Sequence, residues 1–177
     1  MLLDNVRAYV SGGPGRILLY DDEKRAVRPV DDFNALLEPS PYIGALVPGL
    51  AEHLREFPMR PLPGAEDFLY WSKEKFGFTP FVTVTHVTIA PPLPTSVVIT
   101  SKDVYSSRYF DASLTLTVAS DSVSSPEAIY LVYVNRSRAS ALKGPLAGLR
   151  RAIVERRAIG SVDENLRGVK RRLETAQ

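Results

Sequence analysis

Residues 108–120, RYFDASLTLTVAS, alternate apolar and polar side chains along most of their length. Successive side chains of a β-strand point to opposite faces, so this alternation places an apolar row on one face and a hydroxyl-rich row on the other. Sheets with one polar face are antiparallel. The segment therefore predicts a strand in an antiparallel sheet with one buried face. The apolar row consists of Phe110, Ala112, Leu114, Leu116 and Val118.

Five further segments have the β-branched and aromatic composition of strands. For the second and third of them, a helix over residues 65–76 that ends at Gly77 is the alternative, and the composition favours two strands. We therefore expect about six strands in all. The five segments are residues 15–22, 67–73, 78–90, 95–105 and 129–137.

Two short helices are expected between the first strand and the others. Asp31 or Asp32 could cap a helix that carries Phe33, Leu36 and Leu37. One or two helical turns and then a second helix, from Pro48 to Phe57, are expected after Ser40. Proline is favoured in a first helical turn, and Pro58 would end the helix.

The end of the chain has the pattern of a long helix that is kinked near Gly160. Ser161 and Glu164 form a capping box, which marks a helix start. The side chains that follow at helical spacing form one apolar stripe, which we expect to pack on the sheet. This stripe consists of Val162, Leu166, Val169 and Leu173.

Together these elements predict an α+β fold in one domain that spans residues 1–177. A curved antiparallel sheet of about six strands, with two short helices after the first strand, would wrap around the C-terminal helix. The apolar content of 45% and charged content of 24% are ordinary for a globular domain. We find no apolar run long enough to cross a membrane and no secretory leader. The lack of cysteine excludes disulfides and thiol chemistry.

This order of elements resembles the START-like, or helix-grip, superfamily. Three stretches also resemble a group of uncharacterised bacterial proteins: DFLYWSKEKFGFTP, TSKDVYSSRYFDASL and YLVYVNRSR. The START-like resemblance implies a cavity between sheet and terminal helix that takes lipids or other apolar ligands. The superfamily also includes enzymes, so the fold alone does not assign an activity.

The residues that we expect to bind such a ligand lie on the predicted strands. Tyr105 and Arg108 could reach a polar head group from a strand end, and the alternative for them is a polar hairpin turn. Aromatic side chains could line the cavity, and the alternative is core packing. The predicted ligand-binding residues are Trp71, His86, Tyr105, Arg108 and Phe110.

No motif predicts catalysis. His86, in the middle of a strand, could serve as a general acid or base, but a hydrogen-bonded core or cavity histidine is the alternative. His53 is expected on a helix surface. Because the two histidines are isolated in sequence and the chain has no cysteine, we expect neither a metal site nor a cofactor. Ser101 and Lys102 are adjacent in a strand, so they point to opposite faces and cannot form a dyad.

Basic residues gather near the C-terminus, where residues 136–177 hold eleven of the 22 Lys and Arg but only four of the 20 Asp and Glu. No aromatic residue follows Ala139, which argues against nucleic acid, and an anionic membrane surface is the better partner. A solvated helix face is the simplest interpretation. The basic run consists of Arg150, Arg151, Arg156, Arg157, Arg167, Lys170, Arg171 and Arg172.

The expected function is therefore the non-enzymatic binding of an apolar or amphipathic, lipid-like small molecule between sheet and C-terminal helix. Two alternatives remain open. One is an enzyme of the same fold that uses His86 as acid or base. The other is a peripheral membrane or partner-binding protein that uses the basic C-terminal helices.

Overall fold

The computed structural model describes residues 2–17, 20–22, 25–27, 29–76, 79–107, 110–125, 128–139, 163–164, 166–172 and 174–175. The chain forms two compact units, Met1–Ala139 and Ser140–Gln177. None of the described helices is both long and apolar enough to span a bilayer.

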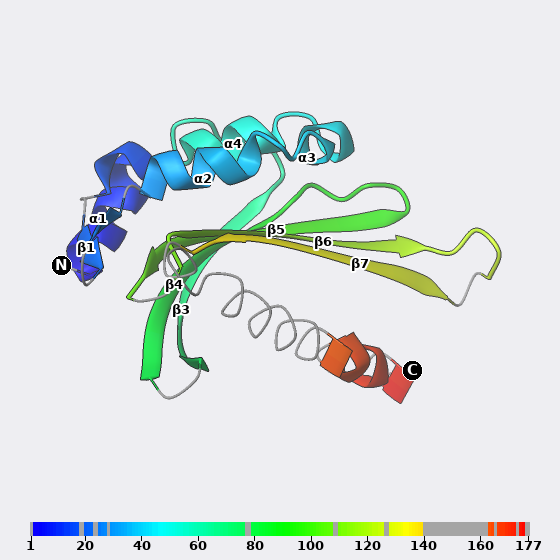
Figure 1. The fold of residues 1–177 in the computed structure, drawn as a ribbon. Helices are drawn as coiled ribbons and strands as arrows, with labels where there is room; N and C mark the ends of the chain where they lie inside the picture. The colour runs from blue at the N-terminus through cyan, green and yellow to red at the C-terminus, as the bar shows by residue number, and fades with distance from the viewer. Residues whose placement is uncertain are drawn as a thin grey trace. The chain divides into compact units, whose positions relative to one another are not determined.

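The first unit is built on a five-stranded antiparallel sheet in which each strand pairs with the next one along the chain. The sheet order is β3-β4-β5-β6-β7, so β3 and β7 are its edges (Figure 1). The α+β class and the antiparallel sheet are confirmed, and residues 65–76 hold a strand rather than a helix. The strands are β3 Glu66–Phe76, β4 Thr79–Ile89, β5 Ser96–Ser106, β6 Ala112–Asp121 and β7 Ile129–Arg138.

Among its described residues, the predicted first strand over residues 15–22 is a strand only at Tyr20–Asp22, and the main sheet has five strands rather than about six. A 3-10 helix, η1 Pro14–Arg16, occupies the start of that segment. β1 Tyr20–Asp22 is extended, and it pairs with β2 Arg25–Val27 in a separate two-stranded ladder. η1 begins at Pro14, and proline is favoured in a first helical turn.

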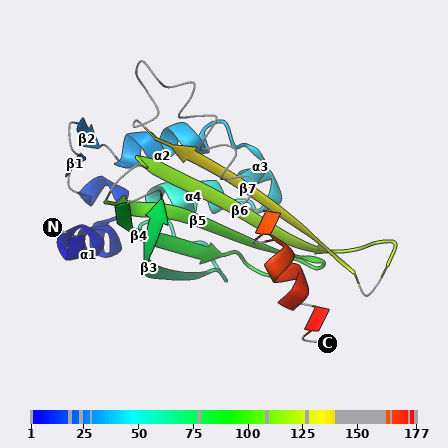
Figure 2. The same cartoon turned by 60° about the horizontal axis from the view of Figure 1, so that its bottom comes forward.

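Four α-helices precede the sheet: α1 Leu2–Gly12, α2 Pro29–Leu37, α3 Tyr42–Leu46 and α4 Leu50–Glu56. Figures 1 and 2 show α2, α3 and α4 on one face of the sheet. The two predicted helices correspond to α2 and α4. The first of these begins at Pro29, so Asp31 and Asp32 lie in its first turn and do not cap it. The one or two helical turns expected before Pro48 correspond to α3, and α1 was not predicted.

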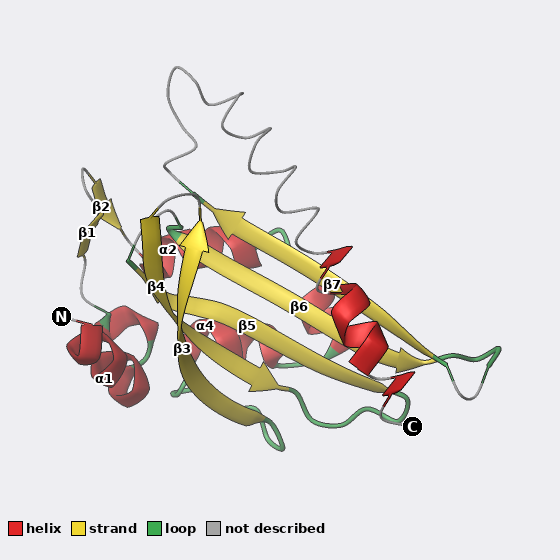
Figure 3. Cartoon of the chain, turned by 90° about the horizontal axis from the view of Figure 1, so that it is seen from below, coloured by secondary structure: helices red, strands yellow, loops and turns green. Residues whose placement is uncertain are grey.

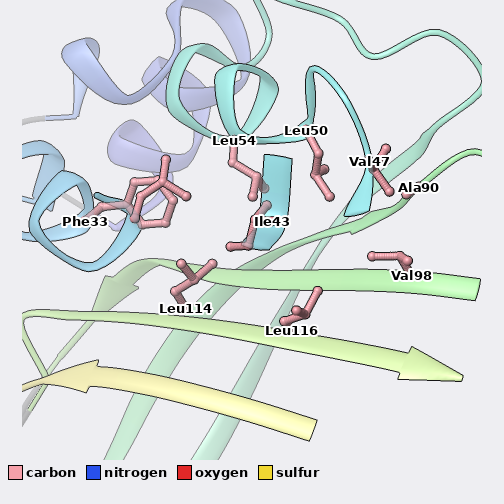
Figure 4. Close-up of a cluster of buried hydrophobic side chains, with 10 residues drawn as sticks. Phe33, Ile43, Val47, Leu50, Leu54, Ala90, Val98, Leu114 and Leu116 are labelled. Atoms are coloured by element: carbon pink, nitrogen blue, oxygen red, sulfur yellow. The ribbon is translucent and has the colours of Figure 1, made fainter. Parts of the chain in front are cut away.

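The even-numbered residues of β5 and β6 point towards the helices, as the alternation in β6 predicts. Side chains from α2, α3 and α4 pack there against β5 and β6 (Figure 4). The largest contributors from the helices are Phe33, Ile43, Leu50 and Leu54, each at most 4% exposed. This core fixes α4 over the middle of the sheet.

A second, smaller core lies under α1. Leu2, Val6 and Tyr9, which are spaced along one face of α1, pack with Val84 of β4 and Val104 of β5. The pairing of β4 with β5 shifts by one residue between Val84 and Thr85, as at a β-bulge. Such a bulge turns the strand locally. Tyr105 packs against this core, although it is odd-numbered and the buried residues of β5 are even-numbered.

In the second unit, the described residues of the segment 163–175 are helical, as Figure 3 shows. The predicted long helix is therefore found only over its last part. Its first half, the kink at Gly160, and the stripe residues Val162 and Leu173 lie outside the described residues.

Candidate functional site

The chain's two histidines meet at one carboxylate in the interior of the first unit. Nε2 of His53 lies 3.0 Å from Oδ1 of Asp67, and Nε2 of His86 lies 2.9 Å from the same oxygen. Thr88 donates a third hydrogen bond of 2.7 Å to that oxygen. The histidine side chains are 2% and 0% exposed, whereas the Asp67 side chain is 21% exposed. We call His53, Asp67 and His86 the His–Asp–His cluster.

Three different elements bring these side chains together. His53 lies in α4 between the core residues Leu50 and Leu54. Asp67 is the second residue of β3 and pairs with Thr88 of β4, while Leu69 pairs with His86. Alternation along the strands therefore places Asp67, His86 and Thr88 on the helix-covered face, directly under α4.

The hydrogen bonds fix the protonation of His53. Its Nδ1 lies 2.7 Å from the main-chain oxygen of Arg60. A carbonyl and a carboxylate can only accept, so both nitrogens of His53 carry hydrogens and the ring is a cation. Nδ1 of His86 lies 2.6 Å from the hydroxyl of Tyr9, which can donate or accept. Burial lowers the pKa of His86 and so favours its neutral form, in which Nε2 donates to Asp67 and Nδ1 accepts from Tyr9.

The pKa directions agree with this assignment. Burial opposes the charge on His53, but the hydrogen bonds to Asp67 and Arg60 outweigh it and raise the pKa of His53. Burial lowers the pKa of His86, and its bond to Asp67 offsets only part of that effect. Burial would raise the pKa of Asp67, but hydrogen bonds from His53, His86 and Thr88 hold it well below its ordinary value.

A buried lysine lies beside this cluster. Lys102 of β5 is 3% exposed, and its ammonium donates to the main-chain oxygen of Leu54. The Nζ atom also lies 4.6 Å from the ring centre of Phe33 and 5.1 Å from that of Tyr9. Burial lowers the pKa of Lys102 to about 7, although the negative charge of Asp67 opposes that shift. Burial likewise raises the pKa of the Tyr9 hydroxyl.

A separate apolar groove of about 390 Å³ lies on the same face of the sheet, near the β7 edge. Side chains of α3, β6 and β7 line it. All of the lining is aliphatic except for Tyr42 and Arg136. The aliphatic lining residues are Leu46, Leu116, Val118, Val132 and Val134.

The two arginines of β7 in this region differ in their partners. Arg138 forms an ion pair of 3.0 Å with the buried carboxylate of Asp32. Arg136 is half-buried and stacks 6.0 Å from the ring centre of Tyr42. Within the described part of the chain no carboxylate pairs with Arg136. The groove therefore ends at a cation that an anionic group could bind.

The five predicted ligand-binding residues do not form one site. His86 and Tyr105 both lie around the core under α1. Trp71 is 70% exposed on the edge strand β3. Phe110 is half-buried with its ring centre 6.0 Å from that of Phe81, and Arg108 lies outside the described residues. The prediction that Ser101 and Lys102 point to opposite faces is confirmed, since only Lys102 is buried.

The prediction that His53 lies on a helix surface is wrong, and so is the premise that the histidines are isolated. Sequence reasoning also missed Tyr9, Asp67 and Lys102. Each of these has a signal in the sequence: Asp67 and Lys102 occupy inward positions of alternating strands, and Tyr9 follows Leu2 and Val6 at helical spacing.

No protein-family model matches the chain, and no curated protein or solved structure shows significant similarity to it. The chemistry of both regions therefore has to be inferred from their own residues and geometry.

Proposed function

We propose that this protein binds an amphipathic small molecule with an anionic head group, and that its apolar part occupies the groove between α3, β6 and β7. The observation that carries the proposal is the composition of the groove, which is aliphatic along its length and holds one cation, Arg136. A fatty acid or a similar apolar carboxylate would match this groove, because it joins an apolar chain to one anionic group.

The size of the groove supports a ligand of this class. Pockets for small molecules begin at about 300 Å³, and this one measures about 390 Å³. Each buried methylene contributes about 0.8 kcal/mol, so a chain of eight carbons would supply roughly 6 kcal/mol before the cost of association. A dissociation constant no tighter than about the millimolar range is therefore expected for a ligand of this length, since millimolar binding corresponds to about 4 kcal/mol.

Arg136 would supply the specificity for an anion. Its guanidinium can donate two parallel hydrogen bonds to a carboxylate, and the Tyr42 ring beside it holds its plane in place. The neighbouring Arg138 is already engaged by Asp32 and is not available for this role.

The finer description of the fold, a START-like helix-grip domain over the whole chain, also remains a proposal. The antiparallel meander and the helices that precede it support the description. A ligand cavity between the sheet and the terminal helix is part of the same proposal. The groove differs from that cavity because it is formed entirely within the first unit.

The groove is preferred over catalysis by His86, since that side chain is fully buried and both ring nitrogens are engaged. Attachment to a membrane through the basic C-terminal residues also remains a proposal. Of that run, Arg167, Lys170, Arg171 and Arg172 are described, and all four are exposed.

Titration calorimetry with octanoate and with octanol tests the proposal. We expect octanoate to bind the wild-type protein and octanol to bind at least about tenfold more weakly, because the alcohol lacks the charge. Arg136→Gln should remove this preference, whereas Arg55→Gln, at an exposed position of α4, should leave it unchanged.

A second variant tests the apolar groove independently of the charge on Arg136. Val132→Trp fills the groove with a larger side chain at a position that is 51% exposed, so the fold tolerates it. We expect this variant to lose binding of both ligands. Equal binding of octanoate by wild type and by Val132→Trp would exclude the groove as the site.

A further inference from the structure

We propose that His53, Asp67 and His86 form a binding site for one divalent transition-metal ion of the zinc class. The structure brings one ligand atom from each residue within 4.8 Å of the other two. Two imidazole nitrogens and a carboxylate oxygen are a frequent ligand set for zinc. The chain has two histidines and no cysteine, so this cluster holds both of its histidines.

The distances suit tetrahedral coordination with little movement. Zinc binds nitrogen and oxygen ligands at about 2.0–2.2 Å, which places the ligand atoms of a tetrahedral site about 3.3 Å apart. Oδ1 of Asp67 is already 3.0 Å and 2.9 Å from the two Nε2 atoms. Only small rotations of the side chains would be needed to place a metal between the three atoms.

Hydrogen bonds orient both histidine rings through their Nδ1 atoms. Metal-binding histidines donate from their second nitrogen in a bond that fixes the orientation of the ring. Nδ1 of His53 already makes such a bond to the main-chain oxygen of Arg60, and Nδ1 of His86 lies beside the hydroxyl of Tyr9. Thr88 donates to Oδ1 of Asp67, the oxygen that would bind the metal, and so orients the carboxylate.

The ring hydrogens of the two histidines can be accounted for when the metal binds. His53 carries two ring hydrogens, and it would release the one on Nε2 and keep the one that it donates to Arg60. His86 would move its hydrogen from Nε2 to Nδ1, where the oxygen of Tyr9 can accept it. One proton is therefore released for each metal ion bound.

The site is partly open to solvent at Asp67. The histidines are buried, but Asp67 lies on the edge strand β3 and its side chain is 21% exposed. Water could therefore enter as the fourth ligand, which makes three protein ligands sufficient.

The site is independent of the proposed groove. The groove is lined by residues of α3, β6 and β7, whereas the metal ligands come from α4, β3 and β4. Failure of either proposal therefore leaves the other unaffected.

The test is a zinc titration of the full, untagged chain, stripped with a chelator and measured in competition with a chromogenic zinc indicator. We expect one equivalent to bind to the wild type. Asp67→Asn and His53→Gln should each weaken the affinity by more than about 100-fold, because loss of an outer hydrogen-bond partner alone costs about 10- to 100-fold. Asp121→Asn, the same change at an exposed position of β6, should bind as the wild type does.

A measurement on the wild type covers the case in which the variants do not fold. The imidazole NMR signals of the two histidines should both shift on addition of one equivalent of Zn²⁺, and Co²⁺ should give the visible absorption of a tetrahedral site. Unshifted signals of both histidines at saturating Zn²⁺ would overturn the proposal. So would zinc affinity that is unchanged in a folded Asp67→Asn variant.

Discussion

The hydroxyl of Tyr9 lies 2.6 Å from Nδ1 of His86, although the two residues are 77 positions apart in the chain. Both side chains are fully buried. The bond joins the first helix to the second strand of the sheet. It thus connects two distant elements of the fold and contacts one member of the His–Asp–His cluster.

Tyr9→Phe should destabilise the protein by about 1–3 kcal/mol, because the change leaves the buried Nδ1 acceptor of His86 without its donor. Urea denaturation followed by circular dichroism measures this loss. Tyr130→Phe removes the same hydroxyl at a position that is 61% exposed, and it should change the stability by less than about 0.5 kcal/mol. Equal effects of the two substitutions would contradict the role assigned to Tyr9.

The stability should rise with pH above neutrality because of Lys102. Its pKa is about 7 in the folded protein, whereas the unfolded chain keeps that proton up to about pH 10.4. Between these values the unfolded state binds more protons, so a higher pH favours the folded state, by at most about 1.4 kcal/mol per pH unit.

Comparison of urea denaturation at pH 7 and pH 9 tests this dependence, and the free energy of unfolding should increase by about 2 kcal/mol. Lys102→Met should flatten the increase, since the buried methionine has no proton to lose. Lys170→Met, at an exposed helical position, should retain it. A change in stability between pH 7 and pH 9 that is the same in wild type and in Lys102→Met would refute the assignment.

The ion pair between Asp32 and Arg138 should be stronger than the one between Glu56 and Arg60. In the first pair the carboxylate is 6% exposed and the distance is 3.0 Å. In the second both side chains are at least 46% exposed and the distance is 3.4 Å. Double-mutant cycles should give a coupling of about 1–3 kcal/mol for the first pair and below about 0.5 kcal/mol for the second. The reverse order would show that burial does not control the strength of these pairs.

Gly13→Ala should be strongly destabilising, and Gly15→Ala should not. Gly13 has φ of 78°, and a Cβ there would lie 2.5 Å from the main-chain oxygen of Phe57. We expect a loss of about 1–3 kcal/mol. A Cβ on Gly15 would meet no atom within 4 Å, and its backbone needs no positive φ. Thermal unfolding of the two variants, which differ only in position, provides the comparison.

Much of the sheet could be predicted from the sequence, because its strands have a strong local pattern. In β6, the alternation identifies Leu114 and Leu116 as core residues, and the structure places both in the main core. The same reasoning separates Lys102 from Ser101 correctly. Where an element is short, the prediction is less complete: β1 is limited to three residues.

The His–Asp–His cluster could not be predicted in this way. Alternation indicates that His86 points inward, but it does not say which other polar side chains meet it there. His53 occupies a helix between two core leucines, and its burial depends on Asp67 from a different element. Such pairings depend on how α4 lies across β3 and β4, which local periodicity does not encode.

Helices α2, α3 and α4, which pack on one face of the sheet, precede it in the chain, and this order has a consequence for synthesis on the ribosome. Residues up to Glu56 emerge first, yet Ile43, Leu50 and Leu54 have no apolar surface to pack against until β5 and β6 have followed. For about sixty residues of elongation the nascent chain exposes its future core, a situation in which chaperones bind and aggregation competes with folding.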